Sequence, residues 1–254
     1  MSRPHRRPPY AQLLVDDSDP VVASAVRVLA GMPVNFAPAP AAATFALRPL
    51  YNPERRSAVF IVPGLCGVIL TLTMVLFTSI AIVRERERGN LELLITTPIR
   101  SLELMIGKIV PYVLIGYLQI SLIILLGFWL FDVPIRGSVA QFYVAAGAFV
   151  ISTLSLGLLI STIAQTQFQA FQLTFMTFLP QLLLSGFMFP FEGMPWAAQY
   201  LAEAFPLTHF LRIVRGIILR DADLAMLSAE LWPLGVFFLV VMAGATLRFR
   251  KRLD

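Results

Sequence analysis

Five long apolar stretches follow one another between Val59 and Leu247, and polar residues gather in the segments between them. A membrane-spanning helix needs about 20 apolar residues, and four of the five stretches reach that length. We expect helices because lipid cannot satisfy open backbone groups. A β-barrel would instead show alternating segments of about 10 residues. The predicted spans are residues 58–83, 109–131, 139–164, 170–190 and 231–247.

The composition also indicates an integral membrane protein. Of the 254 residues, 57% are hydrophobic and 14% are charged, whereas soluble domains carry about 25% charged residues. The net charge of +5 does not indicate a nucleic-acid partner, because the Lys and Arg residues lie at span ends and face the membrane surface. Cys66 is the only cysteine and lies inside the first span, so it cannot form an intrachain disulfide.

Residues 1–57 are rich in Pro and Ala and contain no apolar core of a signal peptide. A strand is predicted over Tyr10–Asp16, and a short helix over Ser24–Ala30. The segment is too small to bury a core by itself, so we expect it to be a piece of a soluble domain.

The distribution of basic residues predicts the orientation of the spans. Residues 84–108, 165–169 and 248–254 are expected on the cytoplasmic side, because basic residues are denser there than in the remaining segments. Residues 1–57, 132–138 and 191–230 are then on the outer side, together with all three tryptophans. The basic residues on the cytoplasmic side are Arg84, Arg86, Arg88, Arg100, Lys108, Arg248, Arg250, Lys251 and Arg252.

In the segment 84–108, the charge alternates in sign at every position from Arg84 to Arg88, and Gly89 follows. A short apolar face follows, and Thr96-Thr97-Pro98 ends it because the residue before proline avoids the helical conformation. One interpretation is a short amphipathic helix lying on the membrane surface. The other is a lever that docks into a cleft of an ATPase.

Polar residues within the spans are hydroxyls and glutamines, and no Asp, Glu, Lys or Arg lies in the middle of a span. Proton-coupled carriers use an intramembrane carboxylate or histidine, so this pattern favours an external energy source. The hydroxyls are typical of helix packing. The candidates for a substrate path are Gln119, Gln172 and Gln181.

The sequence contains no pattern of catalytic chemistry. His5 and His209 are the only histidines, and neither has the Cys or carboxylate neighbours of a zinc site. The phosphate-binding pattern GxxxxGK[ST] is absent, so the chain is not expected to be an enzyme or to bind a cofactor. Any ATP hydrolysis, with its Mg²⁺, is expected in a partner.

Three segments carry a family resemblance. Arg84–Pro98 resembles the cytoplasmic loop of type-two ABC exporter permeases, and Gly186–Pro195 and Phe205–Gly216 resemble later segments of the same family. They occur in order and at the expected separations. The similarity covers about residues 48–254 and is closest to the bacterial multidrug-efflux-like permeases.

The resemblance implies an all-α integral membrane permease of the bacterial inner membrane, with short re-entrant or interfacial helices on the outer side. It also implies a cytoplasmic ABC ATPase partner, a second permease subunit, contact with membrane lipid, and export of a drug-like or amphiphilic substrate. The residues implied to couple to the ATPase are Arg84, Glu85, Arg86, Glu87, Arg88, Gly89, Glu92, Thr97 and Pro98.

The resemblance further implies that residues 1–57 are a remnant of an extracytoplasmic domain and residues 58–254 the permease domain. Family members usually begin with a further spanning helix, which we expect to be missing here. Two alternatives therefore stay open: a nonfunctional fragment or scaffold protein without transport, and a secondary transporter.

The segment after the fourth span supplies candidates for an outer gate. His209, Arg212 and Arg215 lie at helical spacing. Such side chains can extend to lipid headgroups, or they can form a gate or latch. The full set of gate candidates is Phe189, Pro190, Glu192, His209, Arg212 and Arg215.

Overall fold

The computed structural model of the chain describes residues 11–15, 26, 28, 45–49, 57–89, 101–133 and 136–250. The chain divides into two compact units, Met1–Phe60 and Ile61–Asp254. This boundary lies close to the expected one at residues 57 and 58. The assignment of the first unit to an extracytoplasmic domain stays a prediction.

The first unit contains a two-stranded parallel sheet. Strand β1, Ala11–Val15, pairs with β2, Phe45–Pro49, and Ala11 lies opposite Phe45. The strand predicted over Tyr10–Asp16 is therefore confirmed, and residues 26 and 28 of the predicted short helix are helical.

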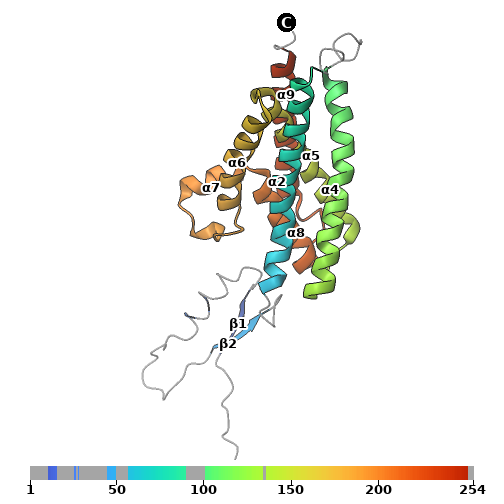
Figure 1. Cartoon of the computed structure of the whole chain (residues 1–254). Helices are drawn as coiled ribbons and strands as arrows, with labels where there is room; N and C mark the ends of the chain where they lie inside the picture. The colour runs from blue at the N-terminus through green and yellow to red at the C-terminus, as the bar shows by residue number, and fades with distance from the viewer. Residues whose placement is uncertain are drawn as a thin grey trace, which may run out of the picture. The chain divides into compact units, whose positions relative to one another are not determined.

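The second unit is built of helices, and the prediction of an all-α membrane protein is confirmed for it (Figure 1). Four helices within the described residues are long and apolar enough to cross a membrane. The helices are α2 Ser57–Glu87, α4 Ser101–Phe131, α5 Val139–Ile163, α6 Gln167–Leu184, α7 Trp196–Glu203, α8 Pro206–Arg220 and α9 Ser228–Arg250, with a 3-10 turn η1 at Phe191–Gly193.

The fourth predicted span, residues 170–190, corresponds to α6, which is not among those four helices. It has only 18 residues, and its glutamines lower its apolar character. About five spans were expected. In the described part of the chain, four helices have the length and composition of a membrane span.

Helix α5 is the central helix of the bundle. Its small residues let neighbouring helices approach closely: a Cβ at Gly157 would lie 2.9 Å from the Val75 carbonyl oxygen of α2. About 72% of its spanning segment is buried, against 17% for α4, which lies at the edge. Hydroxyls join the helices as expected, for example Ser79 to Thr174 between α2 and α6 at 3.2 Å.

One end of the bundle gathers the C-terminal ends of α2, α5 and α9 and the N-terminal ends of α4 and α6, at the top of Figure 1. The connection between α4 and α5 lies at the other end, where the Arg136 amide donates to the Ile218 carbonyl of α8 at 3.1 Å. This arrangement agrees with the predicted grouping of the loops. The assignment of the first end to the cytoplasm stays a prediction.

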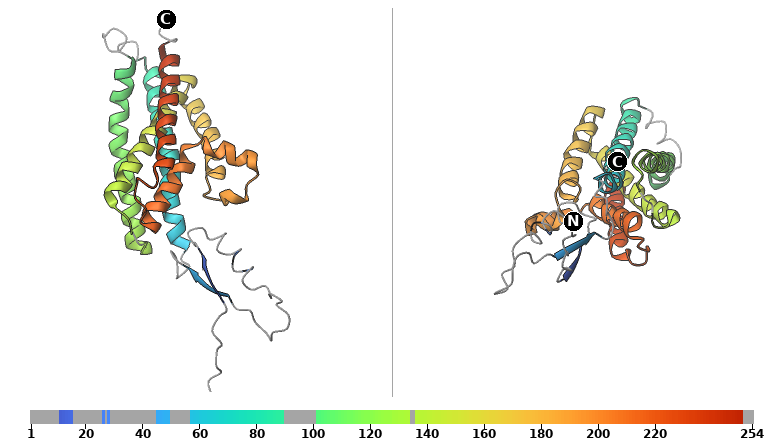
Figure 2. Two further views of the ribbon diagram at one scale, coloured as in Figure 1. Left: turned by 180° about the vertical axis from the view of Figure 1, so that it is seen from behind. Right: turned by 90° about the horizontal axis from the view of Figure 1, so that it is seen from below.

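Helices α7 and α8 match the short helices expected after the fourth stretch. Helix α7, with the turn before it, projects to one side of the bundle in both side views (Figures 1 and 2). Helix α8 is buried along most of its length, and Phe210 stacks on Phe149 of α5 with ring centroids 4.0 Å apart. The sequence did not predict that a helix too short to span would lie in the core.

Candidate functional site

The alternating charges do not form a separate amphipathic helix. Residues Arg84 to Glu87 are the last turn of α2, which continues beyond the predicted end of the first span at residue 83. Gly89 ends the helix with a φ of +73°, a conformation that glycine adopts without steric cost. The interpretation of this segment as a surface helix beginning at Arg84 is therefore wrong for residues 84–87, because the apolar run and the charged run share one continuous helix.

Arg86 binds the C-terminal end of α5. Its guanidinium donates to the Ala164 carbonyl at 3.1 Å and also to the Ser161 carbonyl. The last carbonyls of a helix have no partner within the helix and carry the negative end of its dipole. A cation at this position therefore stabilises the end of α5.

Glu87 binds the N-terminal end of α6. Its carboxylate accepts a hydrogen bond from the backbone amide of Gln167 at 2.9 Å and another from the Gln167 side-chain amide. Gln167 is the first residue of α6, where free amides and the positive end of the dipole favour an anion. We call Arg86, Glu87 and the α5–α6 turn that they bind, residues 164–167, the α2 clamp.

Of the remaining residues implied to couple to the ATPase, some lie at the described end of α2 and the others lie outside the described residues. Arg84 and Arg88 are exposed, and they lie four residues apart, which places them on the same side of a helix. Glu85 is half-buried and Gly89 is exposed. Glu92, Thr97 and Pro98 lie outside the described residues.

The three glutamines of the expected substrate path have different surroundings. Gln119 accepts a hydrogen bond from Thr73 at 2.9 Å, which joins α4 to α2. Gln172 is exposed on α6. Gln181 is buried; its amide donates to the Thr177 carbonyl at 3.2 Å, and its Oε1 has no hydrogen-bond partner among the described residues. Because no hydrogen bond joins any two of them in this part of the chain, the substrate path stays a prediction.

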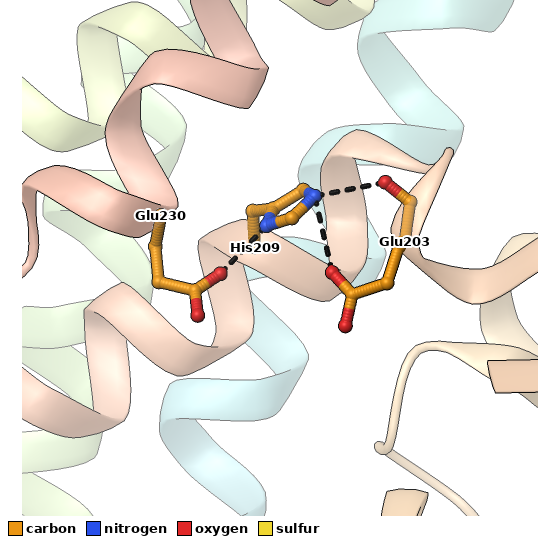
Figure 3. A group of neighbouring side chains, drawn as sticks. All are labelled: Glu203, His209 and Glu230. Atoms are coloured by element: carbon orange, nitrogen blue, oxygen red, sulfur yellow. Dashed lines mark hydrogen bonds and ion pairs between the residues drawn. The ribbon is translucent and has the colours of Figure 1, made fainter. Parts of the chain in front are cut away.

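A network of charged side chains lies where α7, α8 and α9 meet (Figure 3). His209 of α8 stands between two glutamates. Its Nδ1 lies 2.6 Å from Glu230 Oε2 of α9, and its Nε2 lies 2.9 Å from the Glu203 carbonyl of α7. Arg212 contacts both carboxylates, at 2.6 Å from Glu203 and 3.3 Å from Glu230. We call Glu203, His209, Arg212 and Glu230 the His209 cluster.

The contacts of His209 define its protonation state. A carboxylate and a carbonyl can only accept hydrogen bonds, so both ring nitrogens must donate, as they do only in the imidazolium. Burial disfavours the charged form of His209, but its hydrogen bonds to Glu230 and Glu203 outweigh burial and raise its pKa above the ordinary value. The cluster therefore combines two cations with two carboxylates.

The same residues have the composition of a metal site, since ligand atoms of Glu203, His209 and Glu230 lie within 4.8 Å of one another. The geometry does not favour a metal. Each ring nitrogen of His209 already binds a different glutamate, and Arg212 occupies both carboxylates. The arrangement is that of an ion-pair network.

The other gate candidates are less closely joined. Arg215 donates to the Gly186 carbonyl at 3.2 Å and so holds the turn after α6, while the Arg212 guanidinium lies 4.4 Å from the centroid of the Phe191 ring. Phe189 and Glu192 are exposed, and Pro190 is half-buried. His209 and Arg212 bind residues of α7 and α9. These two side chains therefore do not extend toward lipid headgroups in this structure.

Sequence reasoning missed Glu203 and Glu230 as partners of His209 and Arg212. Helical spacing identifies neighbours only within one helix, whereas these glutamates lie on α7 and α9. The signal available was weak: each glutamate is an isolated acidic residue next to an apolar helix segment.

Comparison with known proteins places the chain in a family. The sequence profile of the ABC-2 type transporter family matches residues 28–219. The probable multidrug ABC transporter permease YbhR of Escherichia coli (strain K12) is 35% identical over 215 residues, which are 85% of this chain and 58% of that protein. YbhS of the same strain, with the same description, is 35% identical over 210 residues, 80% of this chain and 54% of that protein.

The inner membrane transport permease YhhJ of E. coli (strain K12) is 32% identical over 209 residues, 79% of this chain and 54% of that protein. The chain thus spans just over half the length of these relatives. Its helices and hydropathy define an integral membrane protein with a helical bundle. It belongs to the ABC-2 type transporter family, as the resemblance of its charged segment indicated.

Proposed function

We propose that this chain is the membrane permease subunit of an ABC exporter in the bacterial cytoplasmic membrane. A separate cytoplasmic ATPase binds at the charged end of α2, hydrolyses ATP with Mg²⁺, and drives the spans between inward and outward access. The substrate class is a drug-like or amphiphilic molecule, and a second permease subunit completes the pathway.

The observation that carries this proposal is the exposed pair Arg84 and Arg88 at the end of α2, in a chain of the ABC-2 type transporter family. The pair lies at the end of the bundle where α5 and α9 also finish (Figure 1). Basic residues at span ends favour the cytoplasmic side, where an ATPase would reach them.

The buried interior is consistent with an external energy source. The buried polar side chains in the described residues are hydroxyls, Gln181 and His209, and His209 is bound by glutamates at the α7–α8–α9 junction. Family membership does not favour the alternatives of a scaffold protein or a secondary transporter.

The test is co-purification of the tagged chain with an ABC ATPase from the same genome, co-expressed with it. We expect recovery of the ATPase in mild detergent and an increase of its hydrolysis rate of at least about fivefold, the lower end of ordinary coupling between sites. An ATPase with its phosphate-loop lysine replaced is the control for hydrolysis. Failure to recover the ATPase with the wild-type chain would contradict the proposal.

Export is tested separately, with ethidium as the probe. Inverted membrane vesicles that contain both subunits should accumulate ethidium when ATP is added, and vesicles with the lysine variant should not. Equal accumulation with both ATPases would contradict ATP-driven transport.

A further inference from the structure

The charged residues at the end of α2 differ in what they contact. Arg84 and Arg88 share one side and are exposed. Arg86 lies two residues from each, which turns it about 200° around the helix axis, away from them. It binds the α5 end, and Glu87 binds the α6 end. The charges that resemble one recognition motif thus differ in their contacts: half-buried Arg86 and exposed Glu87 are bound to helix ends, whereas Arg84 and Arg88 are exposed.

The two internal contacts are matched to helix ends in sign. The Arg86 cation binds carbonyls of α5, and the Glu87 carboxylate binds the first amide of α6. Hydrogen bonds with an ionised partner are about twice as strong as neutral ones. A displacement of α2 that left the α5–α6 turn behind would break both contacts, so the lower-energy movement is a joint one.

We propose that Arg86 and Glu87 are positioning residues that transmit movement from the end of α2 to α5 and α6, and that they do not bind the ATPase. This inference rests on the proposed function, because it needs an ATPase that acts on the Arg84 and Arg88 side. A force on that side moves α2 and, through the α2 clamp, the α5–α6 turn. Helix α6 leads to the turn at Gly186, which Arg215 of α8 holds, so the movement has a path toward the His209 cluster.

The experiment separates binding of the ATPase from stimulation of its hydrolysis. The variants are Arg86→Gln and Glu87→Gln in the clamp, Gln167→Leu on the α6 side of it, and Arg88→Gln as the matched control on the exposed side. Each is expressed as the full chain with its ATPase, and gel filtration in detergent confirms that it is folded. Recovery of the ATPase and fold-stimulation of hydrolysis are measured for each.

We expect the three clamp variants to recover the ATPase within about twofold of wild type and to lose at least about fivefold of the stimulation. The double variant of Glu87→Gln and Gln167→Leu should be no worse than the more severe single one, because both act on the contact between these two side chains. Arg86→Lys, which keeps a donor toward α5, should restore at least half of the stimulation. Arg88→Gln should instead reduce recovery.

Two results would overturn the inference. Loss of ATPase recovery with Arg86→Gln or Glu87→Gln, with Gln167→Leu unaffected, would mean that these charges bind the ATPase directly. Unchanged stimulation in all three clamp variants would mean that the clamp transmits nothing. If the proposed function itself is wrong, the result differs: the wild-type chain would recover no ATPase, and both proposals would be contradicted.

Discussion

The α2 clamp and the His209 cluster each join three helices with charged side chains, but they differ in what neutralises the charge. In the clamp, each side chain binds the end of a helix, and the opposing charge is a backbone dipole. In the cluster, side chains neutralise one another around the buried ring of His209. The clamp therefore depends on helix ends staying in place, whereas the cluster depends on which side chains are ionised.

The largest effect is expected from removing a shared carboxylate of the cluster. Glu230→Ala removes one of the two glutamates that both His209 and Arg212 contact, and we expect it to lower the free energy of unfolding by about 3 kcal/mol. Thermal unfolding in mild detergent is the measurement. The control is Glu192→Ala, an exposed residue that should change stability by less than about 0.5 kcal/mol. Equal effects of the two substitutions would show that the cluster does not hold the three helices.

A smaller effect is expected from the clamp. Arg86→Gln removes the cation from the α5 carbonyls and should lower the free energy of unfolding by about 1–2 kcal/mol. Arg84→Gln is the matched control, since Arg84 is exposed on the same helical turn and should cost less than about 0.5 kcal/mol. If Arg84→Gln were the more damaging change, the assignment of the two sides of this turn would be wrong.

The smallest effect is a dependence on mildly alkaline pH, which we expect from His209 of the cluster. The pKa of His209 is raised in the folded protein, so its stabilising contribution is complete below the unfolded value of about 6.5 and is lost as pH rises through the higher folded pKa. The wild-type chain should therefore lose stability in mildly alkaline solution relative to His209→Gln. Parallel unfolding curves for the two proteins across this range would contradict the charged state assigned to His209.

The spans and the family could be predicted from the sequence because long apolar runs and the segment Arg84–Pro98 are local signals. The strand pairing of β1 with β2 and the core position of α8 could not, since both depend on residues distant in the chain. The partners of Arg86 and His209 were missed for the same reason. Helix ends and isolated glutamates acquire their roles only when separate elements meet.

Gln119 shows what a polar residue within a predicted span can and cannot indicate from sequence. Gln119 stays a candidate for a substrate path, and its hydrogen bond from Thr73 also joins α2 to α4. The sequence could not distinguish these roles, because an amide within a span is equally suited to a substrate and to a neighbouring hydroxyl.

The central claim is that the charged end of α2 faces the cytoplasm, where an ATPase can reach it, and that the α4–α5 connection faces outward. Single cysteines at Arg88 and Ser138, both exposed, test this with a membrane-impermeant maleimide. The neighbouring residue Gly137 is less suitable for a cysteine, because a Cβ there would lie 2.2 Å from the Ile217 carbonyl oxygen. Buried Cys66 makes the unmodified chain the control.

In intact cells, the account predicts labelling of Ser138→Cys and protection of Arg88→Cys, with the reverse pattern in inverted membrane vesicles. Labelling of Arg88→Cys from outside intact cells would place the charged segment out of reach of any cytoplasmic ATPase and would contradict the account.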